Sequence, residues 1–261
     1  AEQTDLPARS YPVVTENTSI PTENGIAVFD AETLEDLRNA GKMLSESACL
    51  HVMAGCAGMA SVLSEYLDLD FKAAPAMPKL DSRLLVICGS VNPITVAQMD
   101  MAEEHGFVRH RFTPEQKMNA AFWEDEAGKE ELQKLREMIE TTTYRIIDTN
   151  DERGNQPTLD YAAANGLTIE DIRQGISKTI GYLSSQLFDS ENLGTMLVTG
   201  GDTLLQCMNY MGIHRLRPIC ELDHGVVLSR FHYKERTQYV ITKSGGFGKQ
   251  DLMLRIAEKL Q

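Results

Sequence analysis

Three times along this sequence, an apolar run of strand type leads into a glycine-containing turn and then into a helical pattern. The three segments are LLVICGSVNPIT (84–95), MLVTGGDTLLQ (196–206) and YVITKSGGFGKQDL (239–252). Unbroken apolar strands that alternate with helices are typical of a parallel sheet covered by helices on both faces. The sequence therefore predicts an α/β fold, with a mostly parallel sheet and glycine-rich loops at the carboxyl ends of its strands.

In an open α/β sheet, loops of this kind gather at one edge, where ligands bind. Glycine lets backbone amides approach a ligand closely, and the first turn of the following helix presents free N–H groups and a partial positive charge. Three such loops together would bind a polyanion, such as the phosphates of a nucleotide. A single loop of this kind is more often a tight turn than a phosphate site, and none of the three matches the dinucleotide fingerprint or the Walker A pattern.

The order of patterns predicts how the chain is divided. Residues 1–23 are rich in Thr, Pro and Glu without apolar periodicity, so we expect an extended lead. Residues 24–72 are expected to form a small, partial α/β block, and the Ala/Pro-rich residues 73–82 a linker. The main domain is expected at 83–261. Within these parts we expect further strands at 25–29, 50–53, 107–112 and 141–148, and helices at 31–44, 59–67, 95–105, 123–140, 168–187 and 250–260.

Charge and composition exclude several classes of protein. The chain has Lys+Arg 25 against Asp+Glu 38, a formal net charge of −13, which argues against a nucleic-acid partner. A local pocket for a small anion remains compatible with that charge. No stretch approaches the ~18 apolar residues of a membrane span, and residues 1–12 lack a secretory signal pattern. The five cysteines are odd in number and scattered, so we expect buried free thiols and a cytoplasmic protein.

Other motifs carry weaker signals. The six histidines show no metal-ligand spacing. The basic triplet Arg109-His110-Arg111 could contact phosphate or could be ordinary edge-strand charge. Asp223-His224-Gly225 could lie in a ligand loop or form a simple turn.

The three loop segments resemble a known family when they are read at full length, as LLVICGSVNPITVAQM, TMLVTGGDTLLQCMNYMGI and YVITKSGGFGKQDLMLRI. They are similar to the C-terminal nucleotide-binding domain of the four-carbon acid sugar kinases. FDAETLEDLRNAG and MAGCAGMASVLSEYL resemble the closing strand–helix units of that family's N-terminal, substrate-binding domain. Family members transfer phosphate from ATP to acids such as threonate, erythronate or their 3-dehydro forms. The resemblance thus implies a phosphotransferase of carbohydrate metabolism.

The resemblance also implies which residues contact ATP. They are Ser90, the run Gly200-Gly201-Asp202-Thr203, and Gly246 in the last loop. An Asp in this position could hold Mg²⁺ directly or through water. To these we add Lys243 as a group that could stabilise phosphate charge.

One departure from the family limits the prediction. Its substrate domain carries an Asp-Asp-x-Thr-Gly motif near the N-terminus, and this chain has none. We therefore assign no catalytic residue, and expect the C-terminal part of a kinase whose substrate half lies on a separate chain or a missing segment. The alternative is a non-catalytic nucleotide-binding module that regulates or scaffolds a partner. A dehydrogenase is disfavoured, because no GxGxxG is followed by an acidic residue at the right distance.

Overall fold

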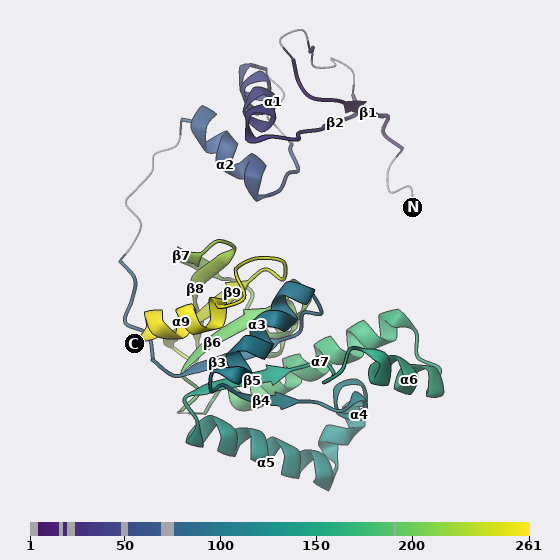
Figure 1. Ribbon diagram of the computed structural model, residues 1–261, viewed down its shortest axis with the longest axis vertical. Coiled ribbons are helices and arrows are strands. Elements are labelled where there is room, and N and C mark those ends of the chain that lie inside the picture. The colour runs from purple at the N-terminus through teal and green to yellow at the C-terminus, as the bar shows by residue number, and fades with distance from the viewer. Residues whose placement is uncertain (1–4, 16–17, 20–23, 48–51, 69–75, 191) are drawn as a thin grey trace. The chain divides into compact units, whose positions relative to one another are not determined.

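The computed structural model describes residues 5–15, 18–19, 24–47, 52–68, 76–190 and 192–261 (Figure 1). The chain separates into two compact units, Ala1–Ala73 and Ala74–Gln261. Among the described residues, no helix is long and apolar enough to cross a membrane.

The N-terminal unit contains two strands and two helices in its described residues. Strands β1 (Ala8–Tyr11) and β2 (Ile26–Phe29) pair in parallel, so the segment expected as an extended lead contributes a strand. Helices α1 (Leu34–Glu46) and α2 (Ala57–Tyr66) follow. Of the strand predicted at 50–53, Leu50 and His51 lie outside the described residues, and Val52 and Met53 are not in a strand.

The C-terminal unit is built on a seven-stranded sheet with the order β4-β5-β3-β6-β9-β8-β7. The first five of these strands run parallel, β8 pairs antiparallel with β9, and β7 pairs antiparallel with β8, which confirms the predicted mostly parallel α/β fold. The strands are β3 (Leu84–Cys88), β4 (Val108–Arg111), β5 (Tyr144–Asp148), β6 (Thr195–Thr199), β7 (Arg217–Asp223), β8 (Val226–Tyr233) and β9 (Arg236–Lys243). The helices are α3 (Pro93–Glu104), α4 (Pro114–Met118), α5 (Glu126–Thr141), α6 (Gln156–Ala164), α7 (Ile169–Leu187), α8 (Gly201–Tyr210) and α9 (Leu252–Leu260), with a 3₁₀ turn at Ala120–Glu124.

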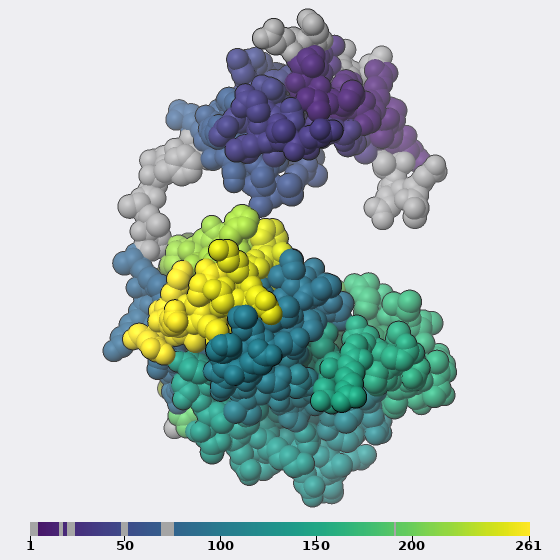
Figure 2. All heavy atoms as spheres, viewed as in Figure 1, coloured from purple at the N-terminus to yellow at the C-terminus, as the bar shows by residue number. Residues whose placement is uncertain are grey.

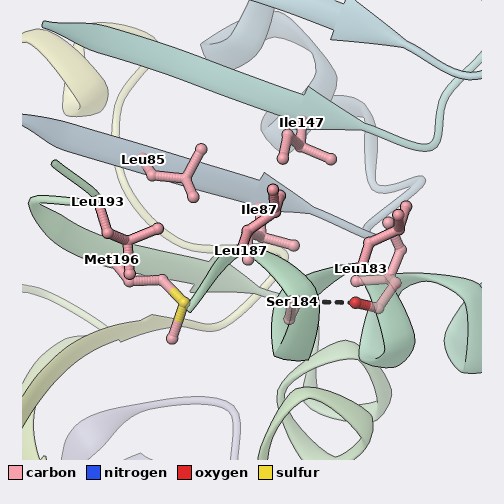
Figure 3. A pocket seen from close by; sticks show the side chains of 9 residues that line it. Leu85, Ile87, Ile147, Leu183, Ser184, Leu187, Leu193 and Met196 are labelled. Carbon is pink, nitrogen blue, oxygen red and sulfur yellow. Dashed lines mark hydrogen bonds between the residues drawn. The ribbon is translucent and has the colours of Figure 1, made fainter. Parts of the chain in front are cut away.

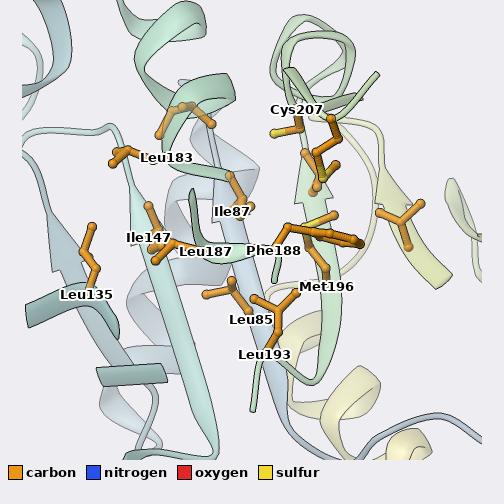
Figure 4. Close-up of a cluster of buried hydrophobic side chains, with 14 of the residues drawn as sticks. Leu85, Ile87, Leu135, Ile147, Leu183, Leu187, Phe188, Leu193, Met196 and Cys207 are labelled. Atoms are coloured by element: carbon orange, nitrogen blue, oxygen red, sulfur yellow. The ribbon is translucent and has the colours of Figure 1, made fainter. Parts of the chain in front are cut away.

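Alternation along the strands gives the sheet two buried faces. Leu84 and Val86 of β3 pack under α3 and α9, which lie side by side (Figure 1, Figure 2). Leu85 and Ile87 point to the opposite face, where they meet side chains of α7 such as Leu183 (Figure 4). Because both faces are covered, the central strands have to be apolar throughout, which explains the unbroken runs in the sequence.

The apolar layer under α7 encloses a cavity of about 10 Å³, lined by residues that include Leu85, Ile147 and Met196 (Figure 3). A water molecule needs roughly 10–15 Å³ and several polar partners. Ser184 is the one polar lining residue, and its hydroxyl donates to the carbonyl of Ile180. This cavity is therefore too small and too apolar to hold a polar ligand, and the candidate site described below lies at the edge of the sheet.

Several features of the chain differ from the sequence-based expectation. The antiparallel β7–β8 hairpin was not predicted, because residues 217–233 do not show the unbroken apolar pattern of the central strands. Helix α6 was not predicted, because its N-terminal end follows a run that reads as a loop. The described cysteines are free, but Cys56 is exposed, whereas Cys88 and Cys207 are buried as expected.

Candidate functional site

The three glycine-containing loops lie next to one another at the carboxyl edge of the sheet. Strands β3, β6 and β9 are neighbours, and Cys88, Thr199 and Lys243 end them in register. The amide of Gly89 donates to the carbonyl of Thr199 at 3.2 Å, and the amide of Gly200 donates to the carbonyl of Lys243 at 3.3 Å. The loops are thus joined where they leave the sheet, as parallel strand order requires.

The first and second loops touch so closely that a side chain is excluded between them. A Cβ added to Gly89 would lie 1.8 Å from Oγ1 of Thr203, which is itself only 4% exposed. Real Cβ atoms do not approach other heavy atoms this closely, so residue 89 has to be glycine with Thr203 in place. Sequence reasoning chose Thr203 and missed Gly89, whose role depends on a partner more than a hundred residues away.

The first and third loops are also in contact. A Cβ on Gly245 would lie 2.9 Å from Oγ of Ser90, and one on Gly246 would lie 3.6 Å from Nδ2 of Asn92. The hydroxyl of Thr95 donates to the carbonyl of Gly245 at 2.6 Å. Ser90 and Gly246, both predicted as site residues, are therefore brought together.

The second loop ends in an open helix N-terminus. Gly200 is the N-cap of α8 with φ +104°, and no side chain caps this helix. A Cβ built on Gly201 would have no described atom within 4 Å apart from its chain neighbours and the backbone of its own helix. The first N–H groups of a helix have no partner within the helix and attract anions. By contrast, α3 is capped by Asn92, whose Oδ1 accepts from the amide of Ile94 at 2.9 Å.

Asp202 lies in the first turn of α8 and is exposed. Its carboxylate pairs with the guanidinium of Arg173 in α7, at 3.0 Å. Sequence reasoning did not select Arg173, which places a cation beside the open end of α8. Within the described part of the chain, no cluster of three or more His, Cys, Asp or Glu side chains could hold a metal ion. A single carboxylate with water and substrate phosphates is nevertheless a common set of Mg²⁺ ligands in kinases.

Lys243 is 3% exposed and directs its ammonium into the protein. It donates to the hydroxyl of Thr95 at 3.1 Å and to the carbonyls of Ser244 and Gly245 at 3.0 Å each. Burial lowers the pKa of Lys243 to about 8. In this arrangement Lys243 fastens the third loop to α3, and a contact between Lys243 and phosphate stays a prediction.

A buried polar network joins the end of β5 to the first loop, and sequence reasoning missed it. Asn150 donates from Nδ2 to the carbonyl of Ser90 at 3.0 Å and to Oδ1 of Asp148 at 2.8 Å. The other oxygen of Asp148 accepts from Nε of Arg109 at 2.8 Å. The polar run DTND (148–151), at the end of strand β5, is the sequence feature that could have indicated this network.

The structure also places the two motifs whose interpretation the sequence left open. Arg109 and Arg111 form ion pairs with carboxylates, Arg109 with Asp148 and Arg111 with Glu103, which favours the structural interpretation of the basic triplet. The residues His224 and Gly225 form the turn between β7 and β8. This turn contacts the third loop, because the amide of Ser244 donates to the carbonyl of Gly225 at 3.2 Å.

Comparisons with known proteins identify relatives of this chain. The family model described as a nucleotide-binding C-terminal domain matches residues 85–253. D-threonate kinase of Salmonella typhimurium is 22% identical over 235 residues, covering 88% of this chain and 53% of the relative. 3-Oxo-isoapionate kinase of Paraburkholderia graminis is 23% identical over 235 residues, covering 85% of this chain and 49% of the relative.

The fold is also found in a solved structure. A crystal structure of a Haemophilus influenzae protein aligns with a TM-score of 0.59 at 17% identity, covering 91% of this chain and 54% of that one. The chain thus spans about half the length of the curated relatives it matches. The matched domain makes up more than half of the sequence, and the chain belongs to the four-carbon acid sugar kinase family, with its nucleotide-binding C-terminal domain at residues 85–253.

Proposed function

We propose that this chain is the nucleotide-binding part of an ATP-dependent kinase that phosphorylates a hydroxyl of a four-carbon sugar acid, such as threonate, erythronate or a 3-dehydro form. The observation that carries the proposal is the convergence of three loops around the open N-terminus of α8. Phosphoryl transfer depends mainly on positioning and on stabilising charge, which backbone amides and a helix N-terminus supply.

Each loop has a part in the proposed site. Gly200, Gly201 and Thr203 would present the first-turn amides of α8 to the phosphates, with Ser90 and Gly246 on the neighbouring loops. Asp202 would hold Mg²⁺, directly or through water, once the cation arrives with the nucleotide. The guanidinium of Arg173 lies 3.0 Å from that carboxylate. Once Mg²⁺ takes its place, Arg173 would be free to turn towards a phosphate.

The proposal also assigns a role to each part of the chain. Residues 83–261 would bind the nucleotide, residues 73–82 would link the two parts, and residues 24–72 would form part of a substrate domain. The remaining substrate-binding half, with its Asp-Asp-x-Thr-Gly motif, would come from a separate chain or segment. This assignment is supported by the relatives, which are about twice the length of the matched region.

Thermal denaturation with and without Mg-ATP tests nucleotide binding. A ligand that binds only the folded state at a hundred times its Kd adds about 2.7 kcal/mol to the free energy of unfolding, so the Tm should rise with concentration. Mg-AMP serves as the control, because it lacks the β- and γ-phosphates and should therefore raise the Tm less than Mg-ATP does. An unchanged Tm at millimolar Mg-ATP would contradict the site assignment.

The non-catalytic alternative predicts a different outcome. A regulatory or scaffolding module would bind Mg-ATP tightly but would not turn it over with any four-carbon acid, even after the substrate half is supplied. Turnover that depends on both the acid and the added half would exclude that alternative.

A further inference from the structure

A groove of about 860 Å³ lies away from the glycine loops, at the outer edge of the sheet. Its walls are the segment 212–217, which joins α8 to β7, and residues 230–232 of β8. We call it the basic groove, because it is lined by Arg215, Arg217, Arg230 and two histidines but by no Asp or Glu. This composition is unusual for a chain with Lys+Arg 25 and Asp+Glu 38.

Two of the arginines face each other directly. Arg217 of β7 and Arg230 of β8 are register partners, and both are exposed. Like charges directly opposite each other in adjacent strands are destabilising. The sheet therefore keeps an unfavourable pair at this position, in a protein with an excess of carboxylates.

The arginines of the basic groove have no carboxylate partner among the described residues. Arg109, Arg111, Arg173 and Arg255 each form an ion pair with a carboxylate. In the part of the chain that the structure describes, Arg215, Arg217 and Arg230 form no ion pair. Their guanidinium groups are available to an external anion.

The basic groove is separate from the loop edge. Val226 pairs with Lys243 at that edge, whereas Arg230 pairs with Tyr239, four residues further along the same two strands. At about 3.3 Å per residue, this places Arg230 some 13 Å from the edge. These arginines therefore do not belong to the proposed phosphate site at the N-terminus of α8.

We propose that the basic groove is a second anion site, which binds a small molecule carrying at least two phosphate or carboxylate groups between Arg217 and Arg230. The planar guanidinium presents parallel N–H donors that match phosphate and carboxylate oxygens in pairs. The groove has the volume of small-ligand sites, roughly 300–1,000 Å³. A bound dianion would neutralise the opposed arginines.

Calorimetric titration with inorganic pyrophosphate, in the absence of nucleotide, tests the proposal on the whole chain. We expect the double variant Arg217→Gln/Arg230→Gln to bind pyrophosphate at least about tenfold more weakly, since hydrogen bonds to charged groups are lost. The control is Lys129→Gln/Lys134→Gln, which removes the same charge from the exposed face of α5 and should stay within about twofold of the unmodified protein.

The outcomes that overturn the proposal are distinct. Equal affinity in the arginine variant would place pyrophosphate elsewhere, including at the glycine loops. Equal loss in both variants would show a general charge effect, and no binding to the unmodified protein at millimolar pyrophosphate would exclude the site. Arginines on edge strands also guard against edge-to-edge association, and β7 ends the described sheet. Self-association of the arginine variant in sedimentation runs, with pyrophosphate affinity unchanged, would assign them that role instead.

Discussion

Gly200 and Gly201 are adjacent but are glycine for different reasons. Gly200 has φ +104°, a backbone conformation that L side chains rarely adopt. Gly201 has no positive φ, and a Cβ there would enter open space among the described atoms. The backbone conformation therefore requires glycine at position 200. At position 201, glycine is required only if a ligand has to approach the first turn of α8.

Substitution of Gly201 separates binding from stability. In Gly201→Val, the branched side chain would occupy the space proposed for phosphate, and we expect Mg-ATP affinity to fall at least about tenfold, or ~1.4 kcal/mol. The Tm without ligand should change little. Gly201→Ala, which adds one methyl group, should lose less affinity than the valine variant. Unchanged affinity in both would show that the loop is only a turn.

The buried Lys243 predicts a dependence of stability on pH. Burial lowers its pKa to about 8 from 10.5, so between these values the unfolded chain holds a proton that the folded protein has released. The free energy of unfolding attributable to Lys243 should therefore rise as the pH increases through that window. Burial also raises the pKa of the nearby Cys88 thiol well above its ordinary value.

Urea unfolding of the unmodified chain and of Lys243→Met, from about pH 7.5 to about pH 10, isolates this effect. The groups that titrate in both proteins cancel in the difference between their unfolding free energies. That difference should grow in favour of the unmodified chain as the pH rises. A difference that is flat or that falls would mean that the Lys243 ammonium is not destabilised by burial.

At the scale of elements, the end of β5 holds the first glycine loop in place. Asn150 is 4% exposed and links the carbonyl of Ser90 to the carboxylate of Asp148. In Asn150→Ala both acceptors lose a donor, and we expect the free energy of unfolding to fall by ~1–3 kcal/mol. Mg-ATP affinity should fall as well, since Ser90 is less well held.

The matched control is Asn165→Ala, at the exposed C-cap of α6. Its Nδ2 donates only to the carbonyl of Tyr161, at 2.8 Å. This variant should lose little stability and no affinity for Mg-ATP. If Asn150→Ala behaves like Asn165→Ala, the link from β5 does not support the loop.

The elements differ in how well the sequence alone predicts them. Strand β3 was predicted at its exact bounds, because a strand covered on both faces must be apolar throughout. The β7–β8 hairpin was not predicted, because Arg217, Arg230 and His232 interrupt the apolar pattern of its strands at the exposed edge of the sheet. The loops of the site could be predicted from glycines that follow strands. Gly89 and Asn150 could not, since their roles arise from contacts between distant segments.

At the scale of the whole molecule, the N-terminal unit is the small unit that we propose to be part of a substrate domain. Its described sheet has two strands, β1 and β2. In β2, the side chains of Ile26 and Val28 are 39% and 47% exposed. Two-stranded sheets are marginally stable on their own. This fits the proposal that further strands from a separate chain or segment complete the domain.

If a separate chain or segment supplies the substrate half, as we propose, activity should depend on it. Without a site that holds the acceptor hydroxyl in line with the nucleotide, the gain from positioning two substrates is lost. We expect the 261-residue chain to phosphorylate neither threonate nor erythronate at rates of roughly 1–100 s⁻¹. A coupled ADP-release assay with and without each acid measures this.

The control for that assay is the addition of a chain carrying the Asp-Asp-x-Thr-Gly half, which should restore transfer if the enzyme is split. ADP release by the chain alone that depends on the acid would show that the acceptor binds within residues 1–261.

The close approach of Gly89 to Thr203 restricts the order in which the two positions can evolve. A side chain at position 89 would meet Oγ1 of Thr203 at 1.8 Å and its Cβ at 2.9 Å, so residue 203 would first have to become smaller than threonine. Among homologues, the two positions should therefore covary, with a residue larger than glycine at position 89 occurring beside a residue smaller than threonine at position 203. Position 201 has no such partner among the described atoms, and selection for a bound ligand would be all that keeps it glycine.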